Sequence, residues 1–137
     1  MKNWFVYSIL ALVCWGMWAF FPKIAVSYIH PRTAFVYEVL GGLLVGVAAL
    51  VILDVDLGAN VKGIVPSMLT GVAGYLGLFF FLYAVRAGSV TVTSAFTALY
   101  PVITIILAMV FLKEKIAPIQ WLGVGLAIVS VALISYE

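Results

Sequence analysis

Long apolar runs separated by short polar joints dominate this sequence. A bilayer core about 30 Å thick is crossed by roughly 20 helical residues, each of which adds about 1.5 Å. The runs reach that length, and they do not alternate between apolar and polar positions as the strands of a membrane barrel would. The pattern predicts an all-α integral membrane protein with five transmembrane helices, at about residues 4–29, 33–53, 63–85, 90–112 and 118–136.

The joints between the runs carry almost every charge and are too short to hold a soluble domain. We therefore expect residues 1–137 to form a single membrane domain. Orientation follows the Lys and Arg residues of short loops. With a cytoplasmic amino terminus, four would lie inside (Lys2, Lys62, Lys113, Lys115) and three outside (Lys23, Arg32, Arg86). This weak bias favours a cytoplasmic amino terminus and leaves a mixed population of orientations open.

Composition supports a membrane protein and argues against several other classes. Hydrophobic residues make up 66% of the chain and charged residues 9%, with a formal net charge of +2. The basic residues are too scattered for a nucleic-acid surface, so membrane lipid is the expected surrounding and nucleic acid is not a partner. Cys14 is the only cysteine and His30 the only histidine. No cluster offers metal ligands or a nucleophile with its base, so we expect no enzyme activity, metal or cofactor.

Small residues recur at the spacing of helix packing within three of the predicted spans. Such residues let helix backbones approach closely in lipid, and we expect them to mark helix contacts. They are Gly42 and Gly46, then Gly71, Gly74 and Gly77, then Gly123 and Ala127.

A polar stripe runs along the fourth predicted span. Thr93, Thr97, Tyr100 and Thr104 are spaced four, three and four residues apart, so they share one helix face. Pro101 interrupts this helix near the midplane, because it cannot donate to the carbonyl of Thr97. Two interpretations stay open: the stripe lines a solute cavity beside a discontinuous helix, or its hydroxyls bond to their own or a neighbouring helix.

Glu38 is the only acidic residue well inside a predicted span. A carboxylate in the membrane is unfavourable by several kcal/mol unless it faces water, finds a partner or binds a proton, so it is a candidate coupling or substrate group. The alternative is a structural Glu that snorkels or pairs helices.

The first predicted span carries two deep tryptophans and a lysine. Trp15 and Trp18 lie further from the span's ends than an interfacial belt would place them, so they either wall a cavity or pack against a neighbouring helix. Lys23 follows Pro22 near the far end of the span. It either snorkels to the interface or serves as a charge partner for a ligand or for Glu38.

Two stretches resemble the EamA-like family of the drug/metabolite transporter superfamily. The first is Trp15-Gly16 followed by Pro22-Lys23. The second runs from Leu99-Tyr100-Pro101-Val102 through Phe111-Leu112 to Glu114 and then Gln120-Trp121-Leu122-Gly123. Typical members of that family have ten spans in two five-span repeats, so the resemblance implies that this chain is similar to a single repeat. Tyr37-Glu38 stands where many members have an aromatic residue followed by Arg, which favours a cationic solute or proton coupling over an anionic solute.

The combined expectation is a secondary transporter of a small solute: a metabolite, an amino acid or an organic cation. We expect alternating access around a midplane cavity that includes Glu38, Trp15, Trp18, Thr93, Thr97, Tyr100 and Pro101. A chain that is similar to one of two repeats is expected to pair with a second copy, as a homodimer. Because five spans are odd in number, two fused repeats point in opposite directions, so an antiparallel arrangement is preferred over a parallel one. The cytoplasmic (inner) membrane of a prokaryote is the expected location. A selective channel, and a non-transporting membrane scaffold or subunit, remain as alternatives.

Overall fold

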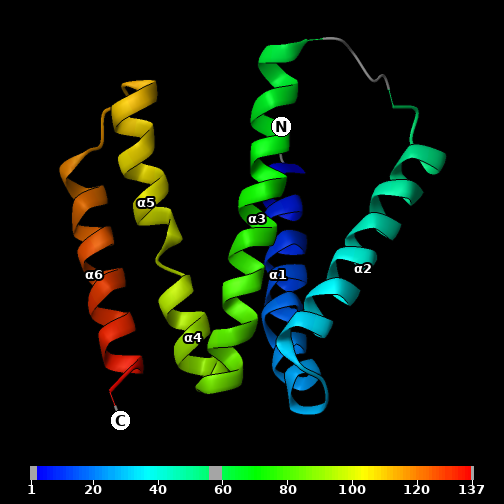
Figure 1. Cartoon of the computed structure of the whole chain (residues 1–137). Coiled ribbons are helices and arrows are strands. Elements are labelled where there is room, and N and C mark those ends of the chain that lie inside the picture. The colour runs from blue at the N-terminus through cyan, green and yellow to red at the C-terminus, as the bar shows by residue number, and fades with distance from the viewer. Residues whose placement is uncertain (1–2, 56–59, 137) are drawn as a thin grey trace. The chain divides into compact units, whose positions relative to one another are not determined.

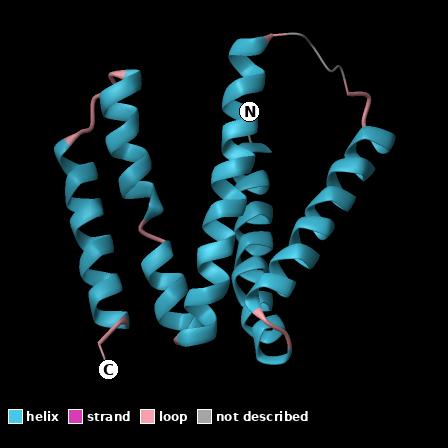
Figure 2. Cartoon of the chain, viewed as in Figure 1, coloured by secondary structure: helices cyan, strands magenta, loops and turns pink. Residues whose placement is uncertain are grey.

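The computed structural model describes residues 3–55 and 60–136, and every regular element in this part of the chain is a helix (Figures 1 and 2). This confirms the predicted all-α membrane fold. The helices are α1 (Asn3–Tyr28), α2 (Pro31–Ile52), α3 (Val61–Ala87), α4 (Val90–Thr97), α5 (Tyr100–Leu107), η1 (Ala108–Leu112) and α6 (Pro118–Ile134).

Within the described residues, four stretches are long and apolar enough to cross a membrane: Trp4–Tyr28, Pro31–Ile52, Val61–Ala87 and Val90–Leu112. The fourth combines α4, α5 and η1. The fifth predicted span corresponds to α6, which is apolar but has 17 residues and ends at Ile134 rather than at residue 136. A helix of that length is at the lower limit for crossing a hydrocarbon core.

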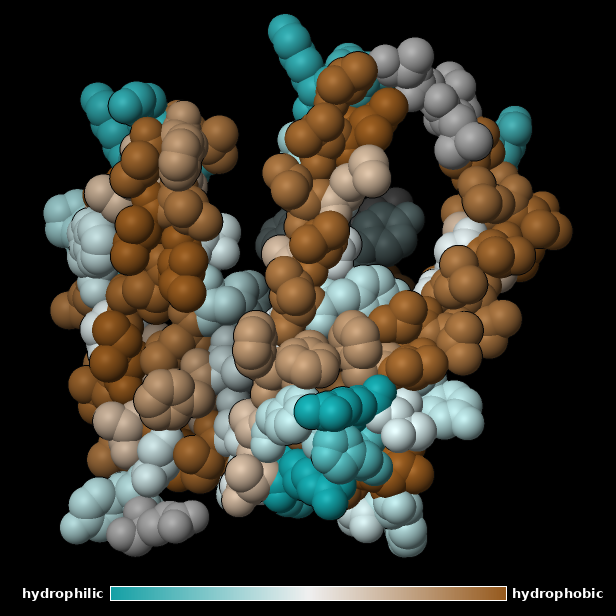
Figure 3. Space-filling view, in the orientation of Figure 1, coloured by the Kyte–Doolittle hydropathy of each residue, from teal (hydrophilic) through white to brown (hydrophobic). Residues whose placement is uncertain are grey.

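The chain divides into two compact units. Unit 1 is Met1–Ala87 and holds α1, α2 and α3. Unit 2 is Gly88–Glu137 and holds α4, α5, η1 and α6. Hydrophobic side chains cover the long sides of the helices within each unit, and hydrophilic ones gather toward helix ends (Figure 3). This distribution suits surroundings of lipid tails bounded by headgroups.

In unit 1, α1 and α3 run in the same direction and α2 runs in the opposite one (Figure 1). All three helices contact one another. The buried residues of this unit lie toward the end where α1 turns into α2 and α3 finishes: Pro22, Val26, Pro31, Ala34, Leu78, Phe81, Leu82 and Val85. We call this the basic end of unit 1, because Lys23, Arg32 and Arg86 also lie there. Toward the other end most side chains are exposed.

The turn between α1 and α2 is tighter than the sequence predicted. Residues 30–32 were expected to form a joint, but α2 already begins at Pro31. Proline suits the first position of a helix because the N–H that it lacks would have no partner there. His30 caps the helix, and its Nδ1 accepts a hydrogen bond from the Arg32 N–H at 3.2 Å. Arg86, also expected in a joint, lies in the last turn of α3.

In unit 2, the fourth span is broken where Pro101 predicts a break. Helix α4 ends at Thr97, and α5 begins at Tyr100 with Pro101 in its first turn. Ser89 caps α4, since its hydroxyl accepts from the Thr91 N–H at 3.2 Å. The π-helical turn η1 ends at Leu112, and its C-cap residue Lys113 has a φ of 58°, which turns the chain away from the helix. Helix α6 then packs against α4.

Candidate functional site

Glu38 lies on the α3-facing side of α2, between two contacts that join these helices. Phe35, three residues before it, meets Phe79 edge to face with ring centroids 5.4 Å apart. Gly42, four residues after it, lies against Tyr75 of α3. Because residues three and four apart share a helix face, the Glu38 side chain starts from the same face as both contacts. It stands seven residues from the start of α2, which is about 10 Å.

The carboxylate of Glu38 is partly enclosed by apolar neighbours. The residue is half-buried, and its Oε2 atom is buried without a hydrogen-bond partner among the described residues. A buried polar atom without a partner is unfavourable by about 1–3 kcal/mol, and by more when it carries a charge. The structure therefore leaves this oxygen able to bind a proton or a cationic group.

The Tyr75 side chain of α3 lies against Gly42 of α2. A Cβ at Gly42 would collide with the Tyr75 hydroxyl and would lie 3.1 Å from Cζ of the same ring. The predicted role of Gly42 in helix packing is thus confirmed. Cβ atoms at Gly46, Gly71, Gly74, Gly77 and Gly123 would meet nothing within 4 Å in the described chain. For these glycines a role in packing stays a prediction.

Tyr75 is a residue that the sequence analysis missed. It lines an open apolar groove of about 450 Å³ together with Phe35, Met68, Gly71, Val72 and Leu76. Phe35, which lines this groove, stands three residues before Glu38 on α2. The signal that could have found Tyr75 is its position inside the Gly71–Gly77 run, where small neighbours leave space around a large ring.

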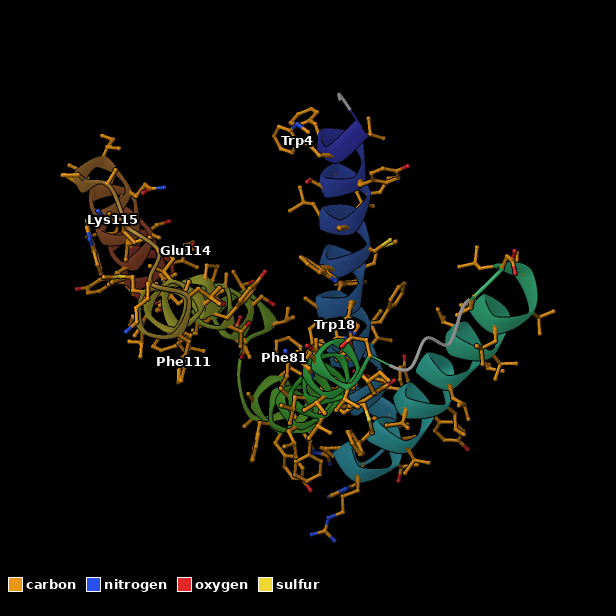
Figure 4. The ribbon with its side chains drawn as sticks, turned by 90° about the horizontal axis from the view of Figure 1, so that it is seen from above. Trp4, Trp18, Phe81, Phe111, Glu114 and Lys115 are labelled. Carbon is orange, nitrogen blue, oxygen red and sulfur yellow. The ribbon has the colours of Figure 1, made fainter. Side chains whose placement is uncertain are left out.

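The two tryptophans of α1 behave differently. Trp18 stacks on Phe81 of α3, with ring centroids 5.5 Å apart and planes inclined by 26° (Figure 4). This contact corresponds to the packing interpretation, although 46% of the Trp18 side chain stays exposed. Trp15 is 62% exposed. For Trp15 to line a cavity, the rest of the cavity wall must therefore be formed by a surface outside the contacts described for unit 1.

Lys23 and Arg86 join the carboxyl ends of α1 and α3 reciprocally. The ammonium of Lys23 on α1 donates to the Val85 carbonyl of α3 at 2.6 Å. Arg86 on α3 donates through Nη1 to the carbonyls of Val26 and Ile29, at 3.3 and 3.1 Å. The last carbonyls of a helix lack partners within it and carry partial negative charge, so cations stabilise them. Lys23 thus has a structural task beyond snorkelling.

The threonines of the predicted polar stripe bond within their own helices. Thr93 donates to the Ser89 carbonyl at 2.8 Å, and Thr97 donates to the Thr93 carbonyl at 3.0 Å. Thr104 donates to the Tyr100 carbonyl at 3.3 Å. A hydroxyl that donates in this way keeps lone pairs for accepting. The stripe can therefore still offer acceptors to a solute, while the Tyr100 side chain is exposed.

Pro101 lies beside an open groove between the broken span and α6. The groove has a volume of about 340 Å³ and is lined in part by Leu99, Pro101, Gln120, Gly123 and Ala127. The missing side chain at Gly123 and the small one at Ala127 keep this space open. Both small residues line this groove, and their role in helix packing stays a prediction.

The predicted site residues fall into two groups, one in each unit. Trp15, Trp18 and Glu38 belong to unit 1, and Thr93, Thr97, Tyr100 and Pro101 belong to unit 2. A common cavity for both groups stays a prediction. Within residues 3–55 and 60–136, no group of three His, Cys, Asp or Glu residues is placed to hold a metal ion.

Long apolar helices, a proline-broken span and an intramembrane carboxylate are features of polytopic membrane transporters. Comparison with known proteins agrees: the profile of the EamA-like transporter family matches residues 2–136. The chain belongs to the EamA-like transporter family, whose members are membrane transporters of small solutes rather than enzymes.

One relative among curated proteins is an uncharacterised protein of Methanocaldococcus jannaschii. It is similar to this chain at 24% identity over 130 residues, which covers 95% of this chain and 94% of the relative. No solved structure matches the chain.

Proposed function

We propose that this protein carries a small organic cation across the membrane by alternating access, in exchange for a proton held at Glu38. The observation that carries the proposal is the buried Oε2 of Glu38, which has no hydrogen-bond partner among the described residues. A carboxylate in apolar surroundings is stabilised by a proton or by a cation, and these two ligands compete for it. Competition for one carboxylate couples the movement of one ligand to that of the other.

The chemistry of the polar stripe supports a solute that donates hydrogen bonds. The hydroxyl hydrogens of Thr93 and Thr97 are used by carbonyls of α4 and its cap, so these groups retain only acceptor capacity. A carboxylate is also an acceptor. An amine or another cation with N–H groups matches both sets, whereas an anionic metabolite matches neither. A zwitterionic amino acid would match through its ammonium group alone.

A second copy of the chain would complete the transporter in this proposal. Five spans place the ends of one repeat on opposite sides of the membrane, so two copies in opposite orientations reproduce the inverted-repeat arrangement of many transporters. The balanced charges of the joints permit both orientations. The proposed location is the cytoplasmic membrane of a prokaryote. Tags at Glu137 found on one face only would exclude the antiparallel dimer.

Transport in proteoliposomes tests the role of Glu38. With an inside-acid pH gradient, we expect wild-type protein to accumulate ethidium and acriflavine as probe cations, both of which carry N–H groups. Glu38→Gln removes the exchangeable charge and should lower gradient-driven uptake at least about tenfold. Glu114→Gln is the matched control, since Glu114 is exposed in a turn and should leave uptake unchanged.

Three results would overturn the proposal. Uptake by Glu38→Gln with the rate and pH dependence of wild type would remove Glu38 from the mechanism. Wild-type protein that moves neither cation, binds neither cation and copurifies with a fixed partner would indicate the scaffold alternative instead. A rate that rises without saturation would indicate a channel.

A further inference from the structure

The basic end of unit 1 has an excess of cations. Arg32 and Arg86 are exposed there, beside the partly buried Lys23. The acidic residues described in unit 1 are Glu38, about 10 Å further along α2, and Asp54, beyond the opposite end of α2. Neither arginine forms an ion pair within the described part of the chain. This end therefore presents positive charge at the edge of an apolar surface.

Arg32 is fixed in place but keeps most of its donors. Its Nε donates to the hydroxyl of Tyr83 on α3 at 3.2 Å. The ring of Tyr83 is in turn met edge-on by the His30 ring, with centroids 6.2 Å apart. The hydrogen bond to Tyr83 uses one of the five N–H groups of the Arg32 guanidinium. The two terminal nitrogens, which match phosphate oxygens in pairs, have no hydrogen bond in the described structure.

Arg86 lies near this group because Tyr83 and Arg86 are three residues apart on α3. Side chains at that spacing share a helix face, with Cβ atoms about 5–6 Å apart. Arg86 uses Nη1 for the carbonyls of Val26 and Ile29. Its charge thus offsets the carboxyl end of α1, and Arg32 is the cation with the larger unused capacity.

The surface that continues from Arg32 into the membrane is apolar. Val36 and Leu40 follow Arg32 at intervals of four residues, so all three occupy one face of α2. Both apolar side chains are exposed, Val36 by 55% and Leu40 by 47%. Tyr28, at the last residue of α1, is also exposed at this end, where aromatic residues suit the headgroup layer. A guanidinium above an apolar stripe complements a phosphate attached to an acyl chain.

We propose that Arg32, oriented by Tyr83 and assisted by Arg86, binds the phosphate of an anionic phospholipid whose acyl chain lies along α2. A soluble phosphate would use the same guanidinium but would gain nothing from Val36 and Leu40. Basic pockets between helices at the membrane surface are suited to anionic headgroups. This inference does not depend on the solute or on Glu38.

The test measures thermal unfolding of the full chain in detergent with added dioleoyl phosphatidylglycerol. We expect the lipid to raise the melting temperature of wild type more than dioleoyl phosphatidylcholine does, because a ligand of the folded state stabilises it. Arg32→Gln should lose more than half of this difference. Tyr83→Phe keeps the charge but removes the bond that orients Arg32, so it should lose a smaller part. Lys62→Gln, at the opposite end of α3, should lose none.

Several results would overturn the proposal. These are full lipid stabilisation in Arg32→Gln, equal losses in Arg32→Gln and Lys62→Gln, or an unchanged effect in Tyr83→Phe. The same temperature shift with glycerol 3-phosphate would assign the site to a soluble anion. Native mass spectrometry gives a second measurement if Arg32→Gln lowers stability on its own: it should retain fewer phosphatidylglycerol molecules than Lys62→Gln. Equal retention would also count against the site.

Discussion

The contact between Gly42 and Tyr75 predicts that one added methyl group has different effects on stability at two glycines of α2, Gly42 and Gly46. In Gly42→Ala, the new Cβ would collide with the Tyr75 hydroxyl and press on Cζ at 3.1 Å. Overpacking of a dense core is unfavourable by about 1–3 kcal/mol, but the Tyr75 hydroxyl is the far end of a rotatable side chain that is 36% exposed beside an open groove, so a cost at the low end, about 1 kcal/mol, is expected here. In Gly46→Ala, the new Cβ meets nothing within 4 Å. The two variants gain the same helix propensity, about 0.5–1 kcal/mol relative to Gly.

The difference between the variants therefore isolates the collision. We expect Gly42→Ala to have a free energy of unfolding about 1 kcal/mol lower than that of Gly46→Ala, and Gly46→Ala to match or slightly exceed wild type. Thermal or denaturant unfolding in one detergent measures both. Helix propensities measured in water can be used here because the gain from Gly to Ala cancels between two positions one turn apart on the same helix.

A double-mutant cycle identifies the partner. Tyr75→Phe removes the hydroxyl that the new Cβ would strike, so Gly42→Ala should be less destabilising in the Tyr75→Phe background. Part of the penalty should remain, because the ring carbon at 3.1 Å stays. Equal effects of Gly42→Ala in both backgrounds would refute this account of the α2–α3 contact. So would equal stability of Gly42→Ala and Gly46→Ala.

Two further predictions concern α1. Lys23→Met should lower the free energy of unfolding by about 1.5–3 kcal/mol, because it removes a charged donor from the Val85 carbonyl, whereas the exposed Lys62→Met should change it by less than about 0.5 kcal/mol. Trp18→Ala should lower it by about 0.5–1.5 kcal/mol for the lost aromatic stack. Trp15→Ala should leave stability unchanged. If Trp15 lines the cavity, this variant should also lower cation uptake. Equal losses of stability in Trp15→Ala and Trp18→Ala would contradict the distinction between the two residues.

The spans were predictable because lipid imposes one requirement on every residue within them. Each backbone group must be paired within the segment, so a long apolar run has to be a helix. The break beside Pro101 was predictable for the same reason, since proline lacks a donor at any position. The edges of α2 and α3 were predicted less well. Pro31 and Arg86 extend these helices, and both are polar or helix-breaking residues that happen to suit a helix end.

The links between helices were not predictable. Lys23 and Arg86 donate to backbone carbonyls, and every residue has such an acceptor, so no sequence pattern marks Val85 or Ile29 as the partner. Pairing of Gly42 with Tyr75 depends on the register between two helices, which hydropathy does not specify. Glu38 was identifiable from its charge alone. Its position between the Phe35–Phe79 contact and the Gly42–Tyr75 contact could be seen only in the structure.

In the proposed mechanism, the position of Glu38 also connects stability to transport. The buried residues of unit 1 gather at the basic end, where Lys23 and Arg86 join α1 to α3. Along α2, the order from that end is the buried Ala34, then Glu38, then Gly42 with its contact to Tyr75. A movement of α2 away from α3 would uncover the carboxylate first. We therefore expect Gly42→Ala, which pushes at this level, to lower proton-driven uptake as well as stability, while Gly46→Ala lowers neither. Normal uptake by a destabilised Gly42→Ala protein would show that the separation of α2 and α3 is not part of the transport movement.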